Sequence, residues 1–139
     1  MVIPSSVVVI RQLAFEGCSA LKNVEFEAGS RLETIGRNSF AQTRVVCVTV
    51  PKSVVELCQG AFQNCRRLVV VTFQEGSRLT RIGESCFQKA NIDEITIPSS
   101  VTVLGCYAFQ QCENLLEVHF QEGSMLRRIG FGCFRWSAI

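Results

Sequence analysis

The sequence is poor in several chemically active residue types and has no excess of charge of one sign. Its 139 residues include one His, one Trp and one Tyr, and 14 basic side chains nearly cancel 12 acidic ones, which leaves a net charge of +2. This balance produces no strong field, so it gives no reason to expect binding to nucleic acid or to a membrane surface. Three prolines and ten glycines are too few for a collagen-like or low-complexity chain.

Long apolar runs are missing as well. The longest uncharged apolar stretch, residues 1–10, contains Pro4 and two serines and is shorter than the roughly 20 residues of a membrane helix. Because it lacks a basic start and a small-residue cleavage site, we expect neither a signal peptide nor membrane insertion. The 47% of hydrophobic residues is enough for a core, and residues 1–139 are expected to form a single domain.

Repetition is the dominant feature of the chain. The turn prolines, the turn glycines and one set of cysteines each recur every 47 residues. A phenylalanine column recurs at 25 and 22 residues in alternation, and it divides each 47-residue unit into two halves. Its members are Phe15, Phe40, Phe62, Phe87, Phe109 and Phe134. The chain therefore consists of about six half-repeats of 22–25 residues.

Each half-repeat contains a short segment of period-two alternation, rich in β-branched and aromatic residues, which predicts a strand with one buried face. The clearest of these segments are residues 23–26, 47–50, 70–73, 94–97 and 117–120. The turn that follows carries either a proline, such as Pro51, or a Gly-Ser pair, such as Gly76-Ser77. Proline ends a strand because it lacks an N–H donor, and glycine permits a positive φ.

A unit of this length cannot bury its own apolar face, so neighbouring units must stack with identical columns in contact. We therefore predict a mostly β solenoid with a parallel sheet of short strands on one face and rungs about 4.8 Å apart. The Gly-led segments 36–40 and 83–87 are too short for an ordinary helix. They are expected to form short helical or 3-10 turns and loops on the other face, carrying the phenylalanines inward.

Residues 97–120 spell Ile-Pro-Ser-Ser-Val-x-x-Leu-Gly-x-x-Ala-Phe-x-x-Cys-x-x-Leu-x-x-Val-x-Phe, and residues 50–73 repeat the pattern with Cys58 in the glycine position. Over the whole chain, this pattern resembles the BspA-like (Treponema-type) leucine-rich repeat. The resemblance implies a curved leucine-rich-repeat solenoid without catalytic residues. It also implies a cell-surface or secreted protein of adhesin-like function, of which this chain is one segment. The missing signal peptide leaves a cytoplasmic location as the alternative.

The eight cysteines are a candidate disulfide framework or zinc site. Column mates such as Cys18 and Cys65 sit two rungs apart, about 9.6 Å from the rung spacing, which exceeds the roughly 7 Å limit for a bridge. Five cysteines in inward columns are predicted to be buried: Cys18, Cys65, Cys86, Cys112 and Cys133. Three others are predicted to be accessible: Cys47, Cys58 and Cys106. With one His and no Cys-x-x-Cys, we expect no metal and no cofactor.

The outward positions of the strands form the expected binding surface, because a solenoid presents an array of adjacent side chains there. The predicted binding residues are Glu25, Thr49, Thr72, Glu94, Thr96, Glu117 and His119. This strip is polar, mildly acidic and free of aromatic side chains, so modest affinity is expected. His119 has no accessible cysteine beside it, and no catalytic residue is predicted.

Five arginines after the Gly-Ser turns are expected to collect along one flank: Arg31, Arg78, Arg81, Arg127 and Arg128. A basic stripe of this kind is able to bind phosphate or a sulfated glycan. Glutamates in or beside the same turns, such as Glu33 and Glu75, favour instead a solvated flank with local charge pairing.

The sequence therefore predicts a non-enzymatic protein-protein recognition module that binds a host or cell-surface protein through the sheet face. The alternative is a structural or self-assembly module whose copies stack end to end through exposed terminal rungs, because an unpaired strand edge is a template for pairing. No nucleic-acid partner is expected for either function.

Overall fold

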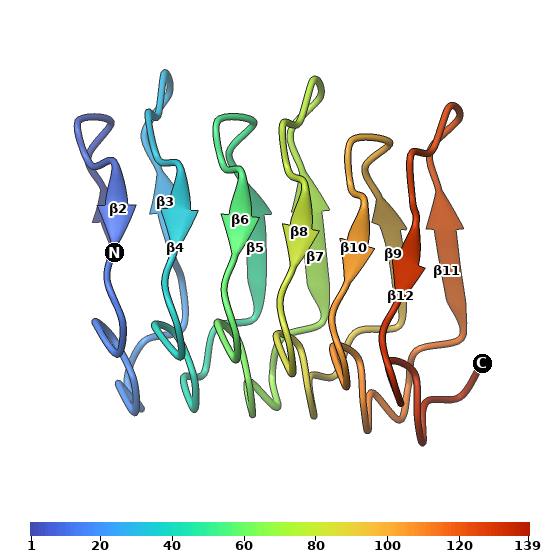
Figure 1. Ribbon diagram of the computed structural model, residues 1–139. Helices are drawn as coiled ribbons and strands as arrows, with labels where there is room; N and C mark the ends of the chain where they lie inside the picture. The colour runs from blue at the N-terminus through green and yellow to red at the C-terminus, as the bar shows by residue number, and fades with distance from the viewer.

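The chain winds into six stacked coils with strands on two sides, and both termini lie in the end coils (Figure 1). The computed structural model describes all residues, 1–139. The long-strand side carries β1 (Val2–Ile3), β3 (Glu25–Phe26), β5 (Cys47–Val50), β7 (Val70–Phe73), β9 (Glu94–Ile97) and β11 (Glu117–Phe120). The short-strand side carries β2 (Val9–Ile10), β4 (Thr34–Ile35), β6 (Glu56–Leu57), β8 (Arg81–Ile82), β10 (Val103–Leu104) and β12 (Arg128–Ile129). The predicted parallel β solenoid of about six turns is confirmed.

The short strands form one continuous parallel sheet in the order β2-β4-β6-β8-β10-β12. Each contributes an outward residue and then an inward aliphatic one, and Ile35 lies in register with Ile10 on one side and Leu57 on the other. The sequence pattern places these aliphatics in a core column but does not predict a second sheet. Two residues are too few for period-two alternation to be recognised.

The long strands pair only two by two: β1 with β3, β5 with β7, and β9 with β11, all in parallel. Within the β5–β7 pair, the residue after β7 extends the ladder, because the Gln74 N–H donates to the Val50 carbonyl at 3.1 Å. The corresponding residue is Pro51 after β5 and Pro98 after β9, and a proline has no N–H to donate. No backbone hydrogen bond joins β3 to β5 or β7 to β9. The long-strand side is therefore interrupted twice.

The phenylalanine column forms a continuous stack through the core. The rings of Phe40 and Phe62 lie 5.3 Å apart at an interplanar angle of 5°, and the other consecutive centroids lie 5.1 to 5.6 Å apart. The four inner rings are fully buried: Phe40, Phe62, Phe87 and Phe109. The two outer rings are half-buried because each packs against a single neighbouring coil. Inward packing of the whole column is as predicted.

The segments that carry the phenylalanines are turns without helical structure, which corrects the predicted helical or 3-10 turns at 36–40 and 83–87. Asn38 and Ser85 adopt the left-handed backbone conformation, with φ of 51° and 53°. The Asn38 N–H donates to the Gln59 carbonyl of the next coil, and the Phe40 N–H donates likewise to Ala61. Because alternate amides bond between coils, a helical turn cannot continue. The structure contains no helix with the length and hydropathy of a membrane span.

Candidate recognition surface

All seven residues predicted to bind a partner are exposed on the long-strand side. They are Glu25 on β3, Thr49 on β5, Thr72 on β7, Glu94 and Thr96 on β9, and Glu117 and His119 on β11. Strand alternation directs Val48, Val71 and Ile95 into the core and their neighbours outward. The structure therefore brings the predicted residues onto one outward surface, called the sheet face from here on.

A threonine pair lies near the middle of the sheet face. Thr49 and Thr72 are in register on β5 and β7, and their hydroxyl oxygens lie 2.9 Å apart. Thr96 on β9 is in register with His119 on β11. This row offers uncharged donors and acceptors, since a hydroxyl group can act as either.

Acidic side chains gather at one end of the row. Glu94 and Glu117 are in register on neighbouring strands, and the Nε2 atom of His119 lies 3.1 Å from Oε2 of Glu117. One possible ligand atom from each of these three exposed residues lies within 4.8 Å of the others, so they are the side chains that could hold a metal ion. The Asp93 carboxylate accepts the Glu94 N–H at 2.9 Å, and neither residue forms an ion pair with a lysine or arginine. The arrangement concentrates negative charge and attracts cations.

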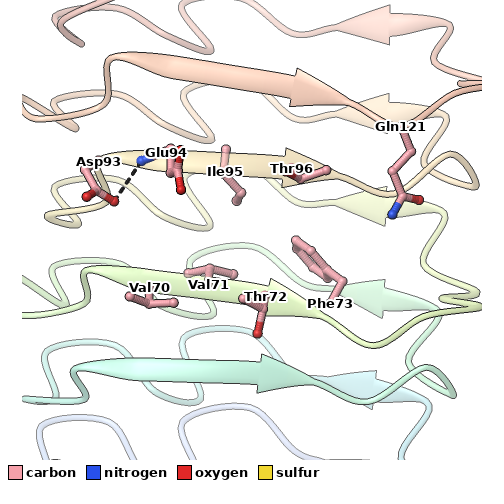
Figure 2. A pocket seen from close by; sticks show the side chains of 9 residues that line it. All are labelled: Val70, Val71, Thr72, Phe73, Asp93, Glu94, Ile95, Thr96 and Gln121. Atoms are coloured by element: carbon pink, nitrogen blue, oxygen red, sulfur yellow. Dashed lines mark hydrogen bonds between the residues drawn. The ribbon is translucent and has the colours of Figure 1, made fainter.

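A pocket of about 310 Å³ opens on the sheet face where β7 and β9 fail to pair. Residues 70–73 line one side and residues 93–96 the other. Figure 2 shows Asp93 and Glu94 at one end of this slot, and Phe73 and Gln121 at the other. The half-buried Phe73 packs against the core and lines the slot from the inward side of β7.

The slot is the part of the surface that sequence reasoning misses, because it depends on two adjacent strands remaining unpaired. Two signals in the sequence point to it. The first is Pro98, which directly follows the strand end at Ile97. The second is spacing: Ile97 lies 24 residues after Phe73, whereas the ends of paired strands, such as Ile97 and Phe120, lie 23 residues apart.

The five arginines of the predicted basic flank are all exposed. Arg81 on β8 and Arg128 on β12 lie on either side of β10, on the short-strand sheet. The Nε atom of Arg81 lies 3.7 Å from Oε1 of Glu56, and this is the only ion pair that the five arginines make. The expected local pairing is therefore limited to one contact with a neighbouring strand, and the turn glutamates take no part in it.

All eight cysteines are free. Four are buried as predicted: Cys65, Cys86, Cys112 and Cys133. Burial raises the pKa of Cys112 and of Cys133 to about 12, so these thiols are protonated and unreactive at neutral pH.

The prediction that Cys18 is buried is wrong. This thiol is exposed because its coil, the first, packs against a neighbouring coil on one side only. Cys47 is exposed as predicted, while Cys58 and Cys106 are partly exposed. Burial raises the pKa of Cys58 as well, with the nearby Glu56 carboxylate adding to the effect.

The sequence matches the BspA-type leucine-rich repeat region in six copies, over residues 1–116 and 33–139. These matches together cover the whole chain. The protein belongs to the BspA-type leucine-rich repeat family.

Solved bacterial structures share the fold. The pneumococcal vaccine antigen PcpA is 31% identical over 88% of this chain and 30% of its own, with a TM-score of 0.85. A leucine-rich cell surface protein from Faecalibacterium prausnitzii is 26% identical over 86% of this chain and 38% of its own, with a TM-score of 0.61. A leucine-rich repeat protein from Eubacterium ventriosum is 17% identical over 99% of this chain and 42% of its own, with a TM-score of 0.79. The chain thus spans less than half the length of each. No curated protein matches the sequence.

Proposed function

We propose that this chain is a non-enzymatic recognition segment of a cell-surface or secreted protein, which binds a protein partner through the sheet face in an adhesin-like manner. Leucine-rich repeat proteins of this family generally take part in protein-protein interaction or are associated with surfaces. Two of the similar structures are described as a vaccine antigen and a cell surface protein, which supports the proposed location.

The observation that carries the proposal is the exposed, in-register array on the long-strand side. A partner that lies along β5, β7 and β9 must cross Thr49, Thr72 and Thr96, which are all exposed. The array combines hydroxyl groups, carboxylates and an imidazole within a few rungs. Such a mixture suits polar recognition, in which a few anchoring contacts supply most of the affinity.

A bulky charge at the centre of the array tests the proposal. We expect Thr72→Arg to abolish capture of surface proteins from candidate host-cell extracts by the immobilised chain. The fold should persist, because an exposed sheet position changes stability by about 1 kcal/mol at most. The matched control is the double variant Arg78→Ser with Arg81→Ser, for which we expect a weak, salt-dependent change. Loss of capture in the control alone would move recognition to the basic flank and favour a sulfated glycan.

End-to-end self-assembly is the second candidate function. The outer edges of β2 and β12 are unpaired, and the end coils expose apolar side chains such as Val9, Ile129 and Phe131. Unpaired edges with apolar flanks are templates for strand pairing. Sedimentation velocity over a concentration series separates the two functions: monomers favour the recognition segment, whereas dimers or filaments lost on Ile129→Lys favour assembly.

A further inference from the structure

The slot between β7 and β9 is bordered on one side by backbone groups that have no hydrogen-bond partner in the chain. Val70 and Gln74 donate their N–H groups toward β5, to Val46 and Val50 respectively. Successive residues of a strand direct their N–H and C=O groups to alternate sides. The intervening residues of β7, at positions 71 and 73, therefore direct theirs toward β9, where no bond receives them.

The facing edge of β9 is open in the same way. The Ile97 carbonyl accepts the Gln121 N–H on the β11 side, so Glu94 and Thr96 direct their backbone groups toward β7. The Glu94 N–H is already bonded to the Asp93 carboxylate, at 2.9 Å. The carbonyl oxygens of Glu94 and Thr96 accept no hydrogen bond. Together with the two carbonyls from β7, they face the slot as free acceptors, beside the free N–H donors of Val71, Phe73 and Thr96.

Charge and apolar surface complete the slot. The carboxylates of Asp93 and Glu94 at one end have no lysine or arginine partner, and Glu117 lies beside Glu94 on the next strand. Val70 and Phe73 line the β7 side with apolar atoms. A cationic occupant that donates hydrogen bonds and carries an apolar stem therefore matches the unpaired carboxylates, the free carbonyls and the apolar lining.

We propose that the slot binds an arginine side chain of the protein partner, an inference that rests on the proposed recognition function of the sheet face. A guanidinium group is planar, carries five N–H donors and no acceptor, and is always charged. Its plane enters between the two strands, its donors meet the carbonyl oxygens of Val71 and Thr96, and its charge lies toward Glu94. The methylene stem packs on Val70, the outward apolar side chain near Glu94.

The spacing of the strands argues against a larger occupant. Cα atoms of β7 and β9 approach within 8 Å of one another. A peptide strand inserted between them would need two rung spacings, about 9.6 Å. The acidic end disfavours a phosphate or carboxylate ligand, since like charges repel. A single basic side chain entering from solvent satisfies both constraints.

The test is an NMR titration of the isotopically labelled chain with N-acetyl-arginine amide. The readout is the chemical shift of the backbone amides of Val71, Phe73 and Thr96. We expect saturable shifts of these amides, with a dissociation constant of about 1 mM or weaker for so small a probe. The neutral isostere N-acetyl-citrulline amide should leave them unchanged. Equal shifts with citrulline, or no saturable shift with arginine, would overturn the proposal.

A matched pair of variants locates the charge that matters. Glu94→Gln should weaken arginine binding by about two- to fivefold, which corresponds to the loss of one exposed ion pair. Glu75→Gln, in the exposed turn after β7, should leave it unchanged. If arginine does not bind but Thr72→Arg still abolishes partner capture, the recognition function stands and only the arginine site fails. If arginine binds but Thr72→Arg leaves capture intact, the proposed function fails instead.

Discussion

The phenylalanine stack makes a quantitative prediction about stability. Phe62 lies in the third coil, fully buried, with ring centroids 5.3 Å from Phe40 and 5.6 Å from Phe87. Its replacement by alanine removes both ring contacts and leaves a cavity. Neighbouring coils cannot fill it, because hydrogen bonds at the short-strand sheet and at the phenylalanine turns hold the coils at the rung spacing. Phe→Ala changes in packed cores cost about 3 to 5 kcal/mol.

Because the variant loses the ring contacts with both neighbours, we expect the cost of Phe62→Ala to lie in the upper part of this range. That is a large share of the roughly 5 to 15 kcal/mol that stabilises an ordinary domain. Urea unfolding followed by circular dichroism measures it, as a lower midpoint at unchanged slope. The control is Phe131→Ala, whose ring is 71% exposed and whose loss should cost less than about 1 kcal/mol. A loss below about 1 kcal/mol for Phe62→Ala would contradict the stacked core.

Four further predictions concern the pKa and the accessibility of the thiols, the interrupted sheet and close packing between coils. Above about pH 9 the unfolded chain releases thiol protons, whereas folded Cys112 and Cys133 retain theirs up to about pH 12. The free energy of unfolding should therefore fall as pH rises through this window. Cys112→Ala should make this fall with pH less steep. In native alkylation, mass spectrometry should find Cys18 and Cys47 modified first and Cys86 last. Pro98→Ala restores an N–H at the end of β9. Hydrogen exchange of that amide should be slow, because the Phe73 carbonyl accepts its hydrogen bond. Rapid exchange would mean that proline is not what interrupts the sheet. Gly83→Ala should destabilise the folded chain by about 1 to 3 kcal/mol, because a Cβ atom would lie 2.7 Å from backbone atoms of Cys58 and Gln59. The control is Gly76→Asn, since Gly76 lies in open space at a φ of 74° that Asn tolerates. This variant should lose much less stability in the same urea assay.

The columns of the sequence were enough to predict the solenoid, since each identical column can be buried only by stacking. Phe40, Phe62 and Phe87 lie where the 25- and 22-residue spacings place them. The outward positions of the sheet face followed from strand alternation, and Thr72 and Thr96 are exposed as expected. These features depend on periodicity alone.

Features that depend on hydrogen-bond partners could not be predicted in the same way. The two-residue strands of the short-strand side are too short to show a period, although each carries an aliphatic column member such as Ile35. The segment 36–40 was expected to form a helical or 3-10 turn, because its sequence gives no sign that Asn38 is left-handed and bonded to the next coil. Cys18 shares the column of Cys65, yet it lies in the first coil, where no further coil covers its outer side, and a column does not record this difference.

The two sides of the solenoid differ in how strictly they fix the spacing between coils. On the short-strand side, glycines such as Gly83 and Gly105 sit directly after the strands against the backbone of the previous coil, and the sheet there is unbroken. On the long-strand side, Pro51 and Pro98 remove a donor at every second step, and the ladder opens at both. The short-strand sheet therefore holds the coils together, which leaves the long-strand side free to expose backbone groups at the slot. A binding surface placed on the interrupted side gains hydrogen-bonding groups without loss of the continuous sheet that keeps the coils stacked.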